Sequence, residues 1–169
     1  MHKTLRIIRS EEDIEQRITQ LANEIRAASP SGELTVVGIL DDAFVFLADL
    51  IRAVDVPLSC CFMKVTRQLH DGQTEIHFVS EFDPYGRDIL LVGGLVSTGV
   101  TLEYITRQLS SRGVRSLRTC ALVDKPEERR VDIKPDYAAF QLGEGYVFGY
   151  GLGLQNQFRQ LPYLAMMGE

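Results

Sequence analysis

The chain has 169 residues, of which 45% are hydrophobic and 24% charged, and its formal net charge at pH 7 is −5. The length suits one domain over residues 1–169, and the acidic balance argues against a nucleic-acid partner, because phosphate backbones are bound by concentrated lysine and arginine. No apolar run reaches membrane-spanning length, so we expect no membrane partner.

The three cysteines predict the compartment. Cys60, Cys61 and Cys120 are odd in number, and two of them are adjacent in an apolar run. This arrangement favours buried thiols over a disulfide framework. The N-terminus carries no long apolar stretch of the signal-peptide type. We therefore expect a cytoplasmic protein.

Helical and strand patterns alternate along the chain. Ser10 can cap a first helix at 11–28, with Asp13 answering three positions later. Further helices are predicted at 43–54 and 101–113, and strands at 34–40, 58–65, 74–80, 87–94, 116–123, 137–142 and 146–151. This order predicts an α/β fold with a mostly parallel central sheet flanked by helices. Ligands of such sheets bind at the carboxyl ends of the strands.

The stretch "GGLVSTGVTL" at residues 93–102 joins a strand to a helix. Free N–H groups at the start of that helix favour an anion, and Ser97, Thr98 and Thr101 add hydroxyl donors. Alternatively, Gly93 and Gly94 form only a turn, and Ser97 or Thr98 caps the helix. The Walker lysine and the Rossmann glycine spacing are both absent.

Other polar residues at the same edge have equally plain alternatives. Asp41 and Asp42 could bind a metal, but an aspartate before a helix is more often an N-cap. Lys125 follows a strand, and a lysine in a loop is usually solvated. Tyr146 and Tyr150 could stack on a base, although core aromatics are commoner.

Four segments, "AFVFLADLIRAVDVPLSCCFMKV", "GRDILLVGGLVSTGVTLEYI", "RGVRSLRTCALVDKPEERRVDIKPDYAAF" and "YVFGYGLGLQNQFRQLPYL", occur in this order. Together they resemble the hypoxanthine-guanine phosphoribosyltransferase family, from about Leu5 to Met167. The resemblance implies the type I phosphoribosyltransferase fold, in which a small hood built from the C-terminal segment covers the site. Because residues 34–40 and 88–94 are both continuous apolar runs, we expect them to form adjacent central strands.

The resemblance assigns catalytic acids to positions where this chain has none. The two acids that bind the ribose of phosphoribosyl pyrophosphate correspond to Gly93 and Gly94. The aspartate that serves as general base corresponds to Ser97, and the aspartate that binds a second magnesium ion corresponds to Gly153. A serine hydroxyl cannot take a proton at neutral pH without help.

Two further loops depart from the family pattern. The Lys-Gly pair of the pyrophosphate loop corresponds to Asp41 and Asp42, which reverses the charge and would repel pyrophosphate. The Ser-Tyr pair of the mobile loop corresponds to Arg67 and Gln68. These departures predict that no catalytic residue of the family is retained.

The residues that outline the nucleotide are kept. Lys125 matches the lysine that binds the six-position oxygen of the purine, Tyr146 the stacking aromatic, and Val147 the residue at the edge of the base. Arg129 and Arg159 match family basic residues, the latter associated with pyrophosphate. The implied 5′-phosphate loop consists of Ser97, Thr98, Gly99, Val100 and Thr101.

These matches and departures predict a purine-nucleotide or phosphate binder without transferase activity. The alternatives are a weakly active purine-salvage transferase and a non-catalytic partner of an active relative. No cofactor is expected, whereas an active member of the family would use Mg²⁺. Because family members form dimers or tetramers, we expect a homo-oligomer.

Overall fold

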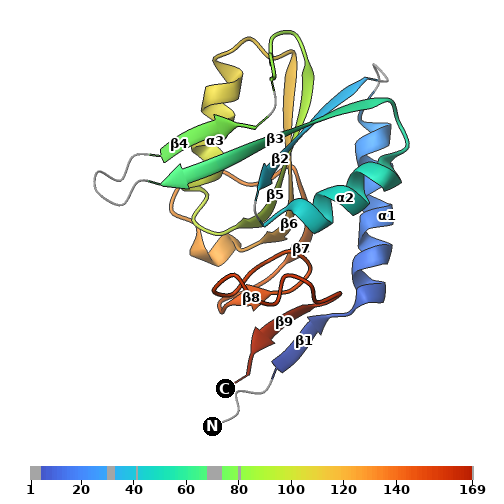
Figure 1. Cartoon of the computed structure of the whole chain (residues 1–169), viewed down its shortest axis with the longest axis vertical. Coiled ribbons are helices and arrows are strands. Elements are labelled where there is room, and N and C mark those ends of the chain that lie inside the picture. Colours follow the sequence, from blue (N-terminus) through green and yellow to red (C-terminus); the bar gives the residue numbers. More distant parts are fainter. Residues whose placement is uncertain (1–4, 30–32, 41, 68–73, 80, 169) are drawn as a thin grey trace.

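The computed structural model describes residues 5–29, 33–40, 42–67, 74–79 and 81–168 (Figure 1). The elements are β1 (Leu5–Arg9), α1 (Glu11–Ala27), β2 (Leu34–Leu40), α2 (Phe44–Val54), β3 (Leu58–Arg67), β4 (Thr74–Phe78), β5 (Asp88–Val96), α3 (Val100–Ser110), β6 (Ser116–Asp124), a 3₁₀ turn (Pro126–Glu128), β7 (Tyr137–Gln141), β8 (Val147–Phe148) and β9 (Leu164–Met167). The helices and strands expected from the sequence are present.

The central sheet has the strand order β4-β3-β2-β5-β6-β7. All neighbouring strands are parallel except the pair β3 and β4, which is antiparallel. Strands β2 and β5 are adjacent, with Val37 opposite Leu91. The predicted fold class and the predicted central pair of strands are therefore confirmed.

Helices cover both faces of this sheet. Helices α1 and α2 pack on one face, and α3 packs on the other (Figure 1). Because both faces are buried, the central strands are continuous apolar runs. At the start of α1, Ser10 and Asp13 form the predicted reciprocal cap, with bonds of 2.9 and 3.1 Å.

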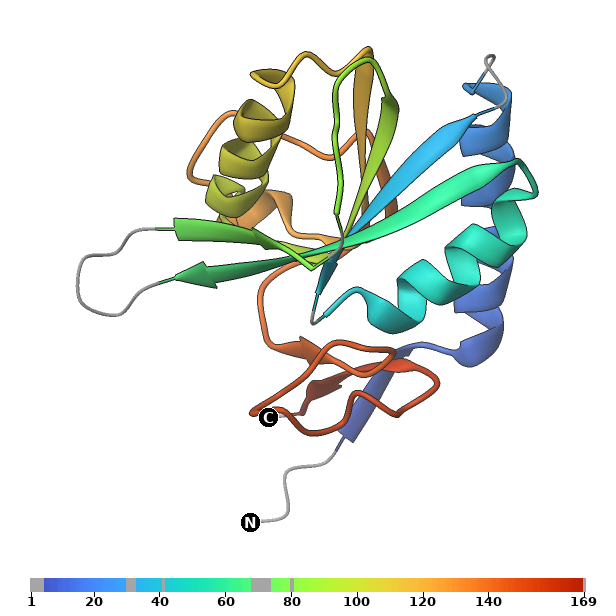
Figure 2. The same cartoon turned by 45° about the horizontal axis from the view of Figure 1, so that its top comes forward.

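A second, three-stranded sheet forms the hood. Its strand order is β1-β9-β8, and it lies below the central sheet in the view of Figure 2. The hood was expected from the C-terminal segment alone, but β1 of the N-terminal segment pairs with β9, with Leu5 opposite Met167. These two short strands carry little local signal, because each is stabilised by a partner at the other end of the chain.

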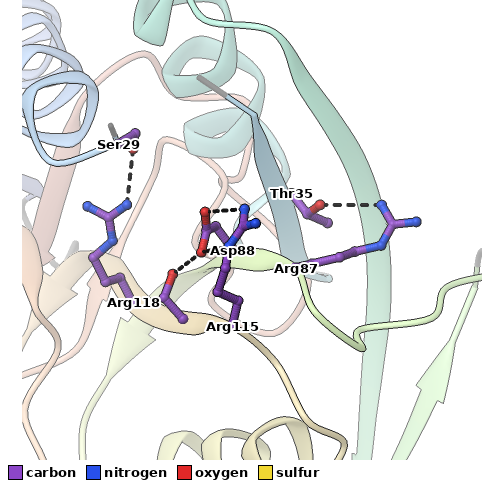
Figure 3. A network of polar contacts seen from close by, with 7 residues as sticks. Ser29, Thr35, Arg87, Asp88, Arg115 and Arg118 are labelled. Atoms are coloured by element: carbon purple, nitrogen blue, oxygen red, sulfur yellow. Dashed lines mark hydrogen bonds and ion pairs between the residues drawn. The ribbon is translucent and has the colours of Figure 1, made fainter. Parts of the chain in front are cut away.

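Polar contacts connect the amino ends of the central strands (Figure 3). Asp88 at the start of β5 accepts two hydrogen bonds from Arg115, at 2.9 and 2.6 Å, and one from Ser116 at 2.7 Å. In the same region Arg118 donates to Ser29 at 3.0 Å. This network lies at the edge of the sheet opposite to the expected ligand site. Its arginines therefore stabilise the contacts between elements and do not contribute to that site.

All three cysteines are free thiols. Cys120 is buried in the core, whereas Cys60 and Cys61 are partly buried. Burial raises the pKa of the Cys120 and Cys60 thiols, which disfavours the reactive thiolate. Among the residues described, none of the helices has the length and apolarity that a membrane crossing requires.

Helix α2 offers a matched test of the core. Phe46 is 0% exposed and Phe44 is 46% exposed. Phe46→Ala should lower the free energy of unfolding by about 3–5 kcal/mol, because it leaves a cavity in the core. Phe44→Ala should cost about 1 kcal/mol or less. Chemical denaturation of both variants measures the difference, and equal losses would contradict the described burial.

Candidate functional site

The carboxyl ends of β2 and β5 bring Asp42 and the loop before α3 to one edge of the sheet. A cavity of about 270 Å³ opens there. It is lined by Ile39, Leu40, Asp42, Gly93, Gly94, Leu95, Val96, Ser97, Thr98, Gly99, Thr101, Leu102, Thr119, Cys120 and Pro135. The loop between β5 and α3 therefore forms one wall of the cavity, as its position at the end of a central strand predicts. By contrast, the residues of the predicted site that are not among those lining the cavity are Lys125, Arg129, Tyr146, Val147 and Arg159.

The loop turns sharply into α3 at Gly99. This residue is the N-cap of the helix and has a φ of 82°. Thr98 Oγ1 accepts a hydrogen bond at 3.4 Å from the N–H of Val100, the first residue of α3, so the alternative of a cap holds in part for Thr98, whereas Ser97 donates to Glu128 instead. A Cβ at Gly99 would lie 2.8 Å from Arg129 Cδ and from Ile133 Cγ2, so only glycine fits. The first N–H groups of α3 lack partners within the helix, as an anion site requires.

Lys125 is buried rather than solvated. Its side chain follows β6 and is only 4% exposed. The ammonium group donates to Glu128 Oε1 at 2.9 Å and to the carbonyl of Gly145. An ammonium group has three donors, so one proton remains beyond these two bonds. The expectation that a loop lysine is solvated is thus wrong here, because the loop folds back over it.

Glu128 is a site residue that the sequence reasoning did not identify. Its carboxylate lies between Lys125 and Ser97, and Ser97 Oγ donates to Glu128 Oε2 at 2.5 Å. These two hydrogen bonds, the one from Ser97 first, hold the pKa of Glu128 below its usual value. The signal in the sequence was its spacing of three from Lys125 in "DKPEE", which the 3₁₀ turn at Pro126–Glu128 converts into a contact.

Arg129 supports the loop from behind. Its guanidinium group forms an ion pair with the buried carboxylate of Asp124 and donates to the carbonyl of Ser97 at 2.7 Å. Arg129 is itself largely buried, at 14% side-chain exposure. Its described contacts thus fix the backbone of the phosphate loop, and the carboxylate partner offsets its charge.

Asp42 does not cap α2. The N-cap of α2 is Ala43, without a side-chain cap, and Asp42 Oδ1 instead accepts a hydrogen bond from Arg159 Nη1 at 2.5 Å. The capping alternative is therefore wrong for Asp42. Asp41 lies outside the described residues, as do Gln68 and the side chain of Arg67.

The glycines at the acidic positions of the family differ in the space around them. Among the described residues, a Cβ at Gly93 would meet Ile39 alone, at an ordinary 3.6 Å. At Gly94 it would lie 2.7 Å from the carbonyl oxygen of Asp42, and at Gly153 2.7 Å from Arg159 Cζ. A side chain at Gly94 thus requires the backbone at Asp42 to move.

Of the two residues expected at the purine base, Tyr146 lies directly before β8 and Val147 is the first residue of β8. Tyr146 is 79% exposed, so the core alternative is wrong for this tyrosine. Tyr150 is buried, and its hydroxyl donates to Asp49, so the core alternative is confirmed there. Val147 is buried and pairs with Met166 of β9. Stacking by Tyr146 and edge contacts by Val147 stay predictions.

Comparison with known proteins finds similarity over nearly the whole chain. Residues 6–157 match the family model of the phosphoribosyl transferase domain. The hypoxanthine-guanine phosphoribosyltransferase of Aquifex aeolicus is 35% identical over 172 residues, 99% of this chain and 97% of that protein. The corresponding enzyme of Bacillus anthracis has a crystal structure with a TM-score of 0.89 and 26% identity, covering 98% of this chain and 100% of that one. The hypoxanthine phosphoribosyltransferase of Trypanosoma cruzi, solved in complex with the product IMP, has a TM-score of 0.90 and 29% identity, over 96% and 93% of the two chains.

The contacts of Glu128 predict a pH dependence of stability. A carboxyl group whose pKa is lowered on folding stabilises the fold above its ordinary pKa, and this contribution disappears as the pH falls through the lowered value. The difference in melting temperature between the wild type and Glu128→Gln should therefore be constant near neutral pH and shrink below about pH 4.5. Thermal denaturation between about pH 3 and 7 measures it. Glu127→Gln, at the exposed neighbouring position, is the control, and a pH-independent difference for Glu128→Gln would contradict the described contacts.

Proposed function

The chain belongs to the hypoxanthine-guanine phosphoribosyltransferase family, and on that premise we propose that it binds a purine nucleotide without catalysing phosphoribosyl transfer. The observation that carries this proposal is the close approach of Gly94 to Asp42. An acid at position 94 would place its Cβ 2.7 Å from the backbone oxygen of Asp42. The chain thus has no acid at this position, and the surrounding backbone leaves no space for one. The neighbouring Asp42 carboxylate is also held in an ion pair with Arg159.

The residues around the cavity do not fit a magnesium ion. Magnesium prefers carboxylate and phosphate oxygens, but three positions that the family resemblance assigns to metal or ribose are Gly93, Gly94 and Gly153. The nearby acids Asp42 and Asp124 are each paired with an arginine. Among the described residues no group of three or more possible ligands could hold a metal. We therefore derive no step through magnesium.

Two retained features support nucleotide binding. The loop from Ser97 to Thr101 offers backbone N–H groups at the start of α3, which attract a phosphate group. The third proton of Lys125 can be donated to the oxygen of a six-oxo purine. This supports tighter binding of the inosine and guanosine monophosphates than of the adenine nucleotide. A mere scaffold would need neither a buried ammonium group nor an open N-terminal turn.

The second candidate is a weakly active transferase, which the hydrogen bond between Ser97 and Glu128 favours. Ser97 replaces the general base of the family, and a hydroxyl group needs a proton acceptor to act in its place. Glu128 Oε2 is such an acceptor at 2.5 Å. In this candidate Ser97 takes a proton from the purine while its own proton passes to Glu128, although the lowered pKa of Glu128 makes it a weak base.

We propose that self-association accompanies either function, since the family resemblance implies a dimer or tetramer. We likewise keep the cytoplasm as the proposed compartment.

An activity assay separates the two candidates. We expect no transfer from phosphoribosyl pyrophosphate to hypoxanthine or guanine above background with magnesium present, because the general base and the ribose acids are replaced together. Turnover of about 1 s⁻¹, a typical enzymatic value, would instead establish that the protein is an active transferase. An active relative assayed alongside is the control. If turnover is seen, its loss in Glu128→Gln would assign the proton acceptor.

Calorimetry with purine monophosphates tests binding. Inosine and guanosine monophosphate should bind more tightly than adenosine monophosphate, with little effect of magnesium. Lys125→Met, which keeps most of the buried volume, should weaken binding of the six-oxo nucleotides by about 1.5–3 kcal/mol, the value of a hydrogen bond to a charged group. Arg52→Ala, which removes a 77% exposed positive charge from α2, is the control. If no monophosphate binds at millimolar concentration, the nucleotide proposal fails and the non-catalytic partner takes its place.

A further inference from the structure

Arg159 of the C-terminal segment reaches across to the loop after β2. Its Nη1 donates to Asp42 Oδ1 at 2.5 Å and to the carbonyl of Gly151 at 2.6 Å. The Arg159 side chain is 24% exposed, whereas that of Asp42 is 51% exposed. The Asp42 carboxylate is therefore bound to the partly buried guanidinium group of Arg159. This ion pair lies beside the cavity that Asp42, Gly94 and the phosphate loop line.

Three glycines make room for this ion pair. A Cβ at Gly94 would lie 2.7 Å from the carbonyl oxygen of Asp42, and one at Gly151 would lie 3.0 Å from the same atom. A Cβ at Gly153 would lie 2.7–2.9 Å from three atoms of the Arg159 guanidinium group. The glycines come from two separate segments, so the position of the ion pair depends on small residues on both sides.

We propose that Asp42 is a specificity-determining residue: its carboxylate fills the anion position of Arg159 and restricts the site to ligands with a single phosphate group. This inference rests on the proposed function, because it names the ligand class of that same site. The planar guanidinium group matches carboxylate and phosphate equally well. A ligand carrying a diphosphate beside the cavity would have to displace Asp42 from Arg159 and remain next to its negative charge.

The chemistry of the pair predicts a gain of binding when the carboxylate is neutralised. An amide at position 42 keeps the size of the side chain and removes the charge that competes for Arg159. Because Asp42 is half-exposed and does not cap α2, this change should leave the fold intact. The phosphate loop at Ser97–Thr101 belongs to another segment, so its affinity for a single phosphate group should change less than the affinity for a diphosphate.

The test is calorimetry with inorganic pyrophosphate in the absence of divalent metal. We expect no measurable binding to the wild type. Asp42→Asn should bind pyrophosphate at least about tenfold more tightly than the weakest binding that the measurement detects. The gain should disappear in the double variant Asp42→Asn/Arg159→Ala. The gain for inosine monophosphate, which carries a single phosphate group, should be smaller than the gain for pyrophosphate.

Asp55→Asn is the matched control. Asp55 is exposed at the opposite end of α2 in the left-handed conformation, which asparagine also adopts, so this variant removes the same charge away from Arg159. The inference is overturned if Asp42→Asn binds pyrophosphate no more tightly than the wild type, if Asp55→Asn gains as much, or if the gain survives Arg159→Ala. Failure of the wild type to bind any purine monophosphate would instead count against the proposed function, since the pyrophosphate measurement uses no nucleotide.

Discussion

Parallel hydrogen bonding among β2, β5 and β6 is the constraint on which the site depends. Parallel strands of one sheet direct their carboxyl ends to the same edge, so the segments that follow them meet there although they are far apart in the chain. The register sets Val37 opposite Leu91 and Val92 opposite Cys120. Helices on both faces bury these strands and hold the edge in place. Because of this arrangement, the loop before α3 and the loop after β2 line one cavity, and the turn after β6 contacts the loop before α3 through Glu128 and Arg129.

The positive charges at this edge are balanced by carboxylates of the same chain. Each basic residue that the family resemblance matches here has an acidic partner: the pairs are Lys125 with Glu128, Arg129 with Asp124, and Arg159 with Asp42. A buried charge is tolerated only when it is paired, which accounts for the first two partners. The pair of Arg159 and Asp42 is more exposed, and so a ligand could compete for it. A phosphate group at this edge therefore depends more on the backbone N–H groups of the loop than on net positive charge.

The glycines at positions that the family resemblance assigns to acids are closely packed at two of three places. The position of Gly94 is limited by the backbone of Asp42, and that of Gly153 by the guanidinium group of Arg159. At Gly93 no described residue sets such a limit. Acids at these three positions would therefore disturb the ion pair at positions 94 and 153 and meet no close described neighbour at position 93. The chemistry of the site is thus coupled to the packing between the hood and the loop after β2.

Local patterns in the sequence determined the helices, the central strands and the reciprocal cap of Ser10 and Asp13, because these features depend on side-chain periodicity and on neighbours within one turn. The same local patterns predicted the adjacent central strands and placed the candidate anion loop, and the family resemblance added the roles expected of single residues. Only the tertiary structure decided that Lys125 is buried, that Asp42 bonds Arg159 instead of capping α2, and that β1 joins the hood. Each of these depends on a partner brought close by the fold of the whole chain, and the free energy of such contacts comes from burial and pairing that no local stretch of residues contains.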